Sequence, residues 1–254
     1  MFLGNVFIMD NVLLKIKNIL PKTVLDILRL AGSIGDYGQV PVFCAGGFVR
    51  DVLLMVNNLD IDLVVEGNGP GFAKELSDKL RGTLVLYKRF GTATVTTKDN
   101  LRIDVATART EYYQSPGVLP RVSFSSMIDD LQRRDFTINA MAFSLNSESY
   151  GRLMDLFNGQ RDLKNMIIRV LHDKSFIDDP TRIYRAIRFE QRYNFAISDD
   201  TERLIRDAVG LGMLEKIDGY RLKKEIELAR SERLSSRVFA RIKQLTGDRD
   251  VSQG

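Results

Sequence analysis

The sequence predicts an α+β protein, in which a mixed sheet with flanking helices is followed by an all-helical part. Up to about residue 107, short apolar runs typical of strands alternate with segments whose apolar residues recur at helical spacing. From about residue 127, nearly every segment follows the helical period. This change of pattern predicts a sheet-containing domain at residues 1–150 and a helical domain at residues 151–254.

The sheet domain begins with helices and two short strands. Residues 11–31 carry apolar positions at helical spacing, and a proline divides them into two short helices or interrupts one helix. The run VFCAGG predicts a buried strand, and residues 48–55 return to the helical pattern. LDIDLVVEG is the next strand, and the amphipathic helix of FAKELSDKLRG after it ends at a glycine.

Further strands and one long loop complete the sheet domain. Residues 83–108 contain two or three strands, with Asp99-Asn100 as a hairpin turn. The segment TEYYQSPGVLPRVSFSS, residues 110–126, combines two prolines, a glycine and several serines. It predicts a long irregular loop between the sheet and the helical part, and loops of that length are usually functional or mobile.

Composition excludes several classes of protein. The single cysteine, Cys44, excludes a disulfide within the chain, and the single histidine, His172, excludes a multi-histidine metal site. No stretch of the sequence has the length and apolarity of a membrane span, and the first twenty residues lack the pattern of a signal peptide. We therefore expect a cytoplasmic protein.

The excess of positive charge lies near the C-terminus. Residues 1–180 contain 21 Lys and Arg against 21 Asp and Glu, whereas residues 181–254 contain 16 against 12. This excess favours either contact with a polyanion in the last third of the chain or a set of solvated helix faces.

Two carboxylates stand one residue apart in LDIDLVVEG. In a strand, residues i and i+2 point to the same face, so Asp60 and Asp62 project side by side. The two anions raise each other's pKa unless a cation or several donors lie between them. The pair therefore predicts either a cation site or a turn cap beside a solvated acid.

A third acid lies at the centre of the strand RIDV. If this strand lies beside LDIDLVV, Asp104 completes an oxygen-rich site for hard divalent cations, of which Mg²⁺ is favoured. Two such ions suit phosphoryl transfer, in which one activates an attacking hydroxyl and the other holds a triphosphate. The alternative for Asp104 is a salt bridge with Arg102 or Arg109.

Two further stretches predict an anion site. In CAGGFVRD, Gly46 and Gly47 lie at a strand-to-helix junction, where backbone N–H groups can approach an anion that Arg50 could clamp. The stretch DLQRRDFTINA predicts a helix start, with Asp135 as its N-cap and Asn139 one turn later on the same face. Its two adjacent arginines suit a phosphate or a ribose hydroxyl.

The segment DDPTRIYRAIRF predicts a helix with an acidic cap and an early proline. Arginines recur on one face at positions 182, 185, 188 and 192, while apolar residues cover the core side. Such a stripe is often a solvated face. Beside an acidic cap that could hold Arg182, it predicts a row of donors aimed at a ligand.

Together these motifs resemble the class II tRNA nucleotidyltransferase and bacterial poly(A) polymerase family, within the polymerase-beta-like nucleotidyltransferase superfamily. The matching segments span residue 41 to at least residue 230: GGFVRD, LDIDLVVEG, RIDVATARTEYY, DLQRRDFTINAMA and RVLHDKSFIDDPTRIYRAIRF. The resemblance implies a nucleotidyltransferase head followed by a helical neck. It also implies transfer of AMP from ATP, with CTP as a second substrate, to the 3′ end of tRNA.

The resemblance implies roles for individual residues. Asp60 and Asp62 would bind the catalytic Mg²⁺ ions, and Asp104 would be a third catalytic acid at a position where the family varies between Asp and Glu. Gly47, with its neighbour Gly46, and Arg50 would hold the triphosphate.

On the neck helix, Asp179 and Arg182 would read the base edge of the incoming nucleotide. A carboxylate and a guanidinium held together can pair with the donor and acceptor edges of C or A without a nucleic-acid template. Five further residues are implied around the ribose and the phosphates: Arg134, Asp135, Asn139, Arg185 and Arg188.

The segment 110–126 corresponds to the family's flexible loop, and its presence favours an enzyme that adds A. Family members continue into body and tail helices that grip tRNA, so we expect either a short member or a fragment truncated relative to them. The alternatives are a poly(A) polymerase and a catalytically weak nucleotide- or RNA-binding fragment. A nucleotidyltransferase acting on an antibiotic or a protein is disfavoured by RRDFTINA and DDPTR.

Four further residues of reactive or aromatic type are expected to have mainly structural roles. His172 is expected to pack or hydrogen-bond at the edge of the helical part, and Cys44 to be buried and inert. Tyr112 and Tyr113 are expected either to stack on a base or to anchor the loop against the sheet.

Overall fold

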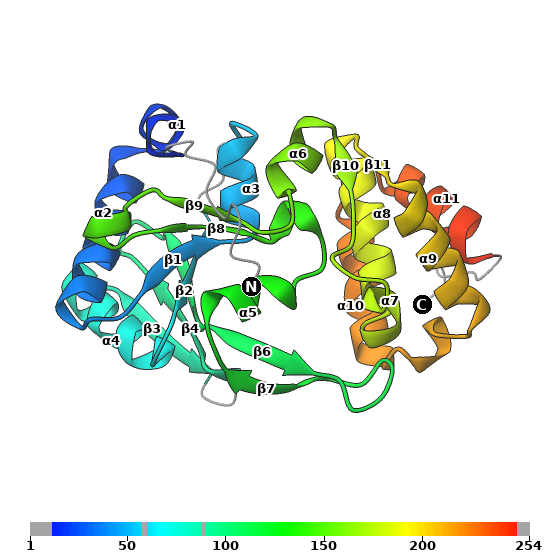
Figure 1. The fold of residues 1–254 in the computed structure, drawn as a ribbon, viewed down its shortest axis with the longest axis horizontal. Coiled ribbons are helices and arrows are strands. Elements are labelled where there is room, and N and C mark those ends of the chain that lie inside the picture. The colour runs from blue at the N-terminus through cyan, green and yellow to red at the C-terminus, as the bar shows by residue number, and fades with distance from the viewer. Residues whose placement is uncertain (1–11, 57–59, 88–89, 248–254) are drawn as a thin grey trace, which may run out of the picture. The chain divides into compact units, whose positions relative to one another are not determined.

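The computed structural model of the protein describes residues 12–56, 60–87 and 90–247 (Figure 1). The chain consists of two compact units. The first unit comprises residues 1–110, 122–134 and 138–160, and the second comprises residues 111–121, 135–137 and 161–254. Within the described ranges, no helix has the length and apolarity needed to cross a membrane.

A mixed sheet is the centre of the first unit. Its seven strands, as far as the chain is described, run in the order β3-β4-β5-β2-β1-β8-β9 (Figure 1). Their bounds are β1 Val42–Ala45, β2 Ile61–Val65, β3 Thr83–Tyr87, β4 Thr92–Thr96, β5 Arg102–Thr107, β8 Met141–Ser144 and β9 Leu153–Asp155. Strands β2 and β5 are parallel, whereas β1 pairs antiparallel with both β2 and β8. The predicted mixed sheet is confirmed.

Helices flank this sheet. They are α1 Val12–Ile19, α2 Lys22–Tyr37, α3 Gly47–Leu53, α4 Gly69–Leu80 and α5 Met127–Gln132. As the sequence predicts, a proline separates the first two helices: Pro21 has a φ of −56° and a ψ of 148°, which stops a helix and permits a new one to begin. Helix α2 buries one apolar face that includes Val24, Leu28 and Ala31.

The end of α4 differs from the sequence prediction. Arg81, not a glycine, is the C-cap and adopts the left-handed conformation with a φ of 51°. Gly82 follows it, and a Cβ atom there would lie 2.6 Å from the carbonyl oxygen of Thr96. The glycine is therefore needed for the close approach of the next strand, and the expectation that it closes the helix is wrong.

Strands β8 and β9 occur where the sequence pattern predicts helices. All four residues of β8 are buried, and the strand lies between β1 and β9. A short apolar run fits a buried strand as well as one face of a helix, so periodicity alone does not separate the two. The prediction that nearly everything after residue 127 is helical is therefore wrong for these two segments.

The helix near RRDFTINA lies upstream of the predicted start. Ser126 is the N-cap of α5, and its side chain forms a reciprocal capping box with Asp129. The helix consequently ends at Gln132, and Thr137–Asn139 form a 3₁₀ turn. Asp135 accepts a hydrogen bond from the next residue's N–H at 2.8 Å and caps no α-helix. The predicted N-cap role of Asp135 is wrong.

The segment predicted as a long irregular loop is partly regular. Strand β6, Arg109–Tyr112, and strand β7, Arg121–Phe124, form a two-stranded sheet. The two prolines lie between these strands, where they remove no donor from either of them. The irregular part is therefore shorter than the sequence suggests.

Helices dominate the second unit, as predicted. They are α7 Ser175–Asp178, α8 Thr181–Tyr193, α9 Asp199–Gly210, α10 Gly219–Arg230 and α11 Ser235–Thr246, and the short helix α6 Gly159–Lys164 begins in the first unit. Helix α8 packs against α10 and α11. Its buried face includes Ile183, Ile187 and Phe189, and the last of these meets Phe136 edge to face at 5.7 Å between ring centroids. A parallel pair, β10 Ile167–Ile168 and β11 Ala196–Ile197, is added to this helical part.

Candidate active site

Two acids lie side by side on the parallel strands of the first unit. Asp62 of β2 and Asp104 of β5 are paired in register, so their side chains leave the same face of the sheet. Asp60 directly precedes β2 and is exposed. The hypothesis that the strand RIDV lies beside LDIDLVV is confirmed, and the register pairs two predicted site residues, Asp62 and Asp104.

Asp104 is neutralised by its neighbours. The hydroxyl of Thr94, on β4, donates to one carboxylate oxygen at 2.6 Å, and Nε of Arg102 donates to the two oxygens at 3.1 and 3.0 Å. The Arg102 side chain is 60% exposed, so this ion pair costs little to open. The salt bridge considered as the alternative for Asp104 is thus present with Arg102.

Asp62 has the opposite environment. Within the described residues its carboxylate makes no hydrogen bond or ion pair, although it is partly buried. The pKa of Asp62 is raised from 3.8 to about 6. Burial is the main cause, and the negative charges of Asp104 and Asp60 also raise the pKa, whereas the guanidinium groups of Arg134 and Arg50 lower it. A carboxylate in this condition favours a cation beside it.

The donor set fits a hard divalent cation that is completed by a ligand. In the part of the chain that the structure describes, no group of three or more His, Cys, Asp and Glu side chains is gathered closely enough to hold a metal ion. Small divalent ions that keep several waters need one or two carboxylates, and substrate phosphates supply the remaining oxygens. Asp60 and Asp62 provide such a pair.

Gly46 makes room for an arginine. Its φ is +70°, and a Cβ atom at this position would lie 2.4 Å from Nη1 of Arg134. That guanidinium also donates to the carbonyl oxygen of Asn139 at 3.3 Å. The strand-to-helix glycine is therefore needed both for its backbone conformation and for the space that Arg134 fills.

Arg50 is buried and bound to neighbouring residues. Its guanidinium donates to both carboxylate oxygens of Asp51, at 2.8 and 3.1 Å, and to the amide oxygen of Asn139 at 2.6 Å. The side chain is 6% exposed. In this arrangement Arg50 orders Asn139 at the end of the RRDFTINA stretch. A Cβ atom at Gly47 would lie 3.4 Å from Nη2 of the same guanidinium.

Sequence reasoning missed Asp130. This acid of α5 is fully buried and binds Arg133 at 2.6 Å and Arg134 at 2.9 Å. Burial alone would raise the pKa of Asp130, but Arg134 and Arg133 hold it below its ordinary value. The spacings i,i+3 and i,i+4 between Asp130 and the two arginines that follow the end of α5 would have revealed the cluster.

In the second unit, the predicted base-reading residues lie at the start of α8. One carboxylate oxygen of Asp179 accepts the N–H of Thr181 at 3.1 Å and its hydroxyl at 2.6 Å. Arg182 is buried, and its Nη1 donates to the hydroxyl of Ser175 at 2.7 Å. Sequence reasoning also missed Arg221, on α10, which forms an ion pair with Asp179 at 2.7 Å.

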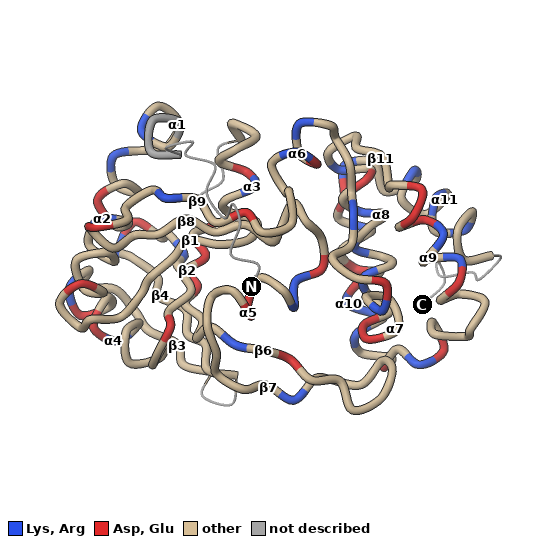
Figure 2. Tube along the Cα trace, in the orientation of Figure 1, with Lys and Arg blue, Asp and Glu red and all other residues tan. Residues whose placement is uncertain are grey.

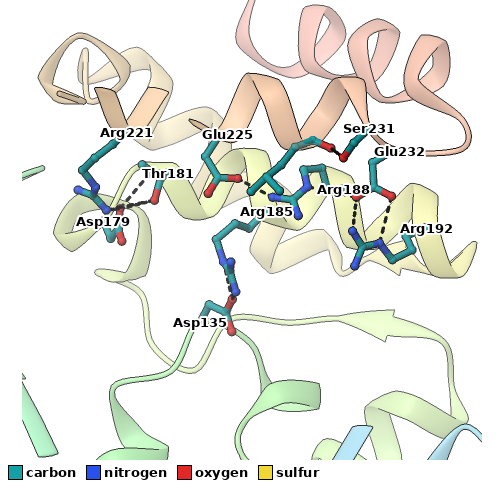
Figure 3. Close-up of polar contacts among 11 residues, drawn as sticks. Asp135, Asp179, Thr181, Arg185, Arg188, Arg192, Arg221, Glu225, Ser231 and Glu232 are labelled. Atoms are coloured by element: carbon teal, nitrogen blue, oxygen red, sulfur yellow. Dashed lines mark hydrogen bonds and ion pairs between the residues drawn. The ribbon is translucent and has the colours of Figure 1, made fainter. Parts of the chain in front are cut away.

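The arginines further along α8 are paired with acids (Figure 3). Arg185 donates to Asp135 at 2.8 Å, and Arg188 binds Glu225 at 2.6 Å and Glu232 at 3.2 Å. Both basic and acidic residues occur in the region of α8 and α10 in Figure 2. The row of donors predicted from the sequence is, in this structure, a set of ion pairs that joins the helices, and Arg192 belongs to it through Glu232.

The remaining residues singled out in the sequence lie in ordinary surroundings. Cys44 is buried in β1, and burial raises the pKa of its thiol well above the ordinary value. Burial also lowers the pKa of His172. The hydroxyl of Tyr113 donates to Glu111 at 2.9 Å, which anchors this loop aromatic, whereas Tyr112 is exposed.

The predicted site residues thus fall into two sets. The set in the first unit is Gly46, Gly47, Arg50, Asp60, Asp62, Asp104, Arg134 and Asn139, and the set in the second unit is Asp135, Asp179, Arg182, Arg185 and Arg188. The first unit thus contains adjacent carboxylates on two parallel strands of a mixed sheet, a glycine at a strand-to-helix junction and the buried Arg50.

The chain belongs to the poly A polymerase head domain family, whose model matches residues 42–169. It is 47% identical over 226 residues to the A-adding tRNA nucleotidyltransferase of Geobacter sulfurreducens, a match that covers 89% of this chain and 26% of that protein. Among solved structures, an apo CCA-adding enzyme is similar with a TM-score of 0.89 and 48% identity, covering 93% of this chain and 56% of that one. The Thermotoga maritima CCA-adding enzyme complexed with tRNA has a TM-score of 0.82 and 46% identity, covering 93% and 54%.

The chain therefore spans between about a quarter and about half of the length of these relatives. Nucleotidyltransferases of this family are generally metal-dependent, in keeping with the surroundings of Asp62.

Proposed function

We propose that the chain is a template-independent RNA 3′-end nucleotidyltransferase that transfers AMP from ATP, and CMP from CTP as a second reaction, to tRNA. The observation that carries this proposal is the register of Asp62 with Asp104, beside Asp60. The names of the similar proteins support the substrate class: an A-adding tRNA nucleotidyltransferase and a CCA-adding enzyme complexed with tRNA. Addition of A is favoured because three relatives at 42–50% identity are A-adding enzymes.

In the proposed reaction, the 3′-hydroxyl of the RNA attacks the α-phosphate of the nucleotide. A phosphodiester bond forms, the bond between the α- and β-phosphates breaks, and pyrophosphate leaves. Mg²⁺, when bound by Asp60 and Asp62, would neutralise phosphate charge and lower the pKa of the attacking hydroxyl. The transfer requires little beyond positioning and charge neutralisation, which this set of acids and arginines can supply.

The protein's own groups then have distinct proposed roles. In the first unit, the junction at Gly46 and Gly47 binds the triphosphate, and Arg134 contributes positive charge that Asp130 holds in place. Arg50 acts by ordering Asn139, since its guanidinium already binds that amide. We assign the first unit to the nucleotidyltransferase head and the second unit to the neck.

In the second unit, Asp179 and Arg182 are the proposed base-reading pair. A carboxylate can only accept hydrogen bonds and a guanidinium can only donate them, so together they match an edge that offers one donor and one acceptor. The edges of A and C share an amino donor at the corresponding position, which would let one protein pair select both.

Incorporation of labelled nucleotides tests the function. The chain is incubated with ATP or CTP and with one of three RNAs: a tRNA ending in C-C, a tRNA lacking CCA, and a generic oligoribonucleotide. We expect AMP addition to the tRNA ending in C-C, and its absence from Asp60→Ala and Asp62→Ala. Retained turnover in either variant would refute the role of these acids.

A poly(A) polymerase is the second candidate, because the family model that matches the chain carries that name. It predicts repeated addition of AMP to all three RNAs. A nucleotide- or RNA-binding fragment without turnover predicts ATP binding and no addition to any of them.

A further inference from the structure

Arg221 connects the start of α10 to the proposed base-reading acid (Figure 3). Its Nη2 donates to Oδ1 of Asp179 at 2.7 Å and to the hydroxyl of Thr181 at 3.3 Å. Its Nη1 donates to the carbonyl oxygen of Gly117 at 3.3 Å. One guanidinium therefore has two anchors, a carboxylate on one side and a loop carbonyl on the other.

Both ends of this bridge are fixed. Asp218 caps α10 by accepting the backbone N–H of Arg221 at 3.4 Å, which holds the arginine in the first turn of the helix. Gly117 has a φ of +75°, and a Cβ atom there would lie 2.7 Å from the carbonyl oxygen of Lys216. The loop at Gly117, whose carbonyl oxygen Arg221 binds, therefore packs closely against the chain just before α10.

The two oxygens of Asp179 are used differently. Oδ1 accepts three hydrogen bonds: from the N–H of Thr181 at 3.1 Å, from its hydroxyl at 2.6 Å and from Arg221 at 2.7 Å. Within the described residues, Oδ2 accepts none. A carboxylate bound by three donors on one oxygen cannot rotate freely, so the direction of its other oxygen is set.

We infer that Arg221 is a positioning residue for base selection: it holds Asp179 through Oδ1, so that Oδ2 remains the acceptor for the exocyclic amine of the incoming nucleotide. This inference rests on the proposed function, in which Asp179 reads the base. Adenine and cytosine both present an amino donor, whereas guanine presents a carbonyl oxygen at the corresponding position. An orientated carboxylate oxygen would bind the first two and repel the third.

A purely structural explanation exists for the same ion pair, because Arg221 also ties α10 to the start of α8. Arg241, on α11, provides the matched comparison. It binds Glu190 of α8 at 3.0 Å, and the side chains of this pair are 18% and 11% exposed, against 20% and 18% for Arg221 and Asp179. Loss of either arginine removes a partly buried tie to α8, and loss of Arg241 also removes its ion pair with Glu202 of α9. Within the described residues, Arg241 forms no hydrogen bond or ion pair with Asp179 or Arg182, the proposed base-reading residues.

The test compares ATP with purine riboside triphosphate, which lacks the exocyclic amine. Binding of each to the 254-residue chain is measured by titration calorimetry in Mg²⁺. We expect the wild type to bind ATP about ten- to a hundredfold more tightly, the range for a hydrogen bond to a charged group. In Arg221→Ala this ratio should fall to about one to threefold, while Arg241→Ala keeps the wild-type ratio.

Two further variants cover the case in which Arg221→Ala does not fold, as judged by its unfolding temperature. Thr181→Val removes the hydroxyl donor from Oδ1 while keeping the side chain's shape, and should lower the ratio by at least threefold. Arg221→Lys keeps the charge but loses the planar fork that reaches two acceptors, so its ratio should lie between those of the wild type and the alanine variant.

The inference is overturned if Arg221→Ala and Thr181→Val retain the wild-type ratio, or if Arg241→Ala loses it to the same extent. A wild type that does not distinguish the two nucleotides overturns it as well. A wild type that distinguishes them and extends no RNA contradicts the proposed function and leaves the role of Arg221 standing.

Discussion

Asp62 and Asp104 are paired in register on β2 and β5, yet one of them is neutralised and the other is not. Asp104 accepts hydrogen bonds from Thr94 and Arg102, whereas Asp62 has no hydrogen bond or ion pair among the described residues. The sheet therefore contains one acid that is already balanced and one that requires positive charge. The unbalanced acid lies within reach of the charges of Arg134 and Arg50, which only partly compensate it.

The metal-free protein is expected to lose stability as pH rises from about 4 to about 6. The pKa of Asp62 is raised from 3.8 to about 6 in the folded state, so the folded state binds this proton more tightly than the unfolded state. The resulting stability is fully present below pH 4 and is lost as pH rises through 6, and it amounts to at most about 3 kcal/mol. Unfolding followed by circular dichroism with a chelator present should show this slope.

The variant Asp62→Asn is the control for that slope, because it removes the titrating group and keeps the side chain's size. Its free energy of unfolding should vary less across the same pH interval and should exceed that of the wild type at pH 7. An identical pH dependence in both proteins would mean that Asp62 is not the group responsible.

Mg²⁺ is expected to stabilise the wild type at pH 7 and to have little effect on Asp62→Ala. A ligand present at a hundred times its dissociation constant stabilises a folded protein by about 2.7 kcal/mol. Thermal unfolding with increasing Mg²⁺ measures this gain. The variant Asp26→Ala, which removes an exposed acid on α2, should respond like the wild type; an equal loss of response in that variant would point to a nonspecific salt effect.

Replacement of Gly46 by alanine should destabilise the protein by about 1–3 kcal/mol and weaken ATP binding. An alanine at this position would have to adopt a φ of +70°, which is unfavourable for residues with a side chain, and its Cβ atom would collide with the guanidinium of Arg134. Gly210, at the end of α9, has no atom within 4 Å of such a Cβ, so Gly210→Ala should leave stability unchanged or raise it by about 0.5–1 kcal/mol. Chemical denaturation of the two variants separates these effects.

Loss of the buried charge at Asp130 should be among the most damaging single changes in the first unit. Asp130→Asn leaves Arg133 and Arg134 without their shared anion, which costs about 3–5 kcal/mol for a buried ion pair. The matched variant Asp26→Asn breaks an i,i+3 pair with Arg29 in which both side chains are more than half exposed, and it should cost less than about 1 kcal/mol. A similar loss in both would show that burial does not decide the cost.

The strands that carry Asp62 and Asp104 could be predicted because their signals are local. Each acid lies within a short apolar run that is typical of a strand. Helix starts were less predictable. At RRDFTINA, Asp135 suggested an N-cap, but the reciprocal bonds of Ser126 and Asp129 fix the helix further upstream.

The partners of the α8 arginines could not be predicted from the sequence. Glu225 and Glu232 follow Arg188 by 37 and 44 residues, and only the packing of α10 against α8 brings them into contact. The strands β8 and β9 were missed for a similar reason. A four-residue apolar run carries no period of its own, and its place in the sheet is decided by pairing with β1.

The carboxylates that accompany the α8 arginines also limit how this helix attracts a polyanion. Arg188 and Arg192 share Glu232, and Arg185 is paired with Asp135. The helix therefore has little uncompensated positive charge that could neutralise RNA phosphates and release their counterions. Binding of RNA to the second unit would then depend less steeply on ionic strength than its number of arginines suggests. Its attraction would come from basic residues outside this row.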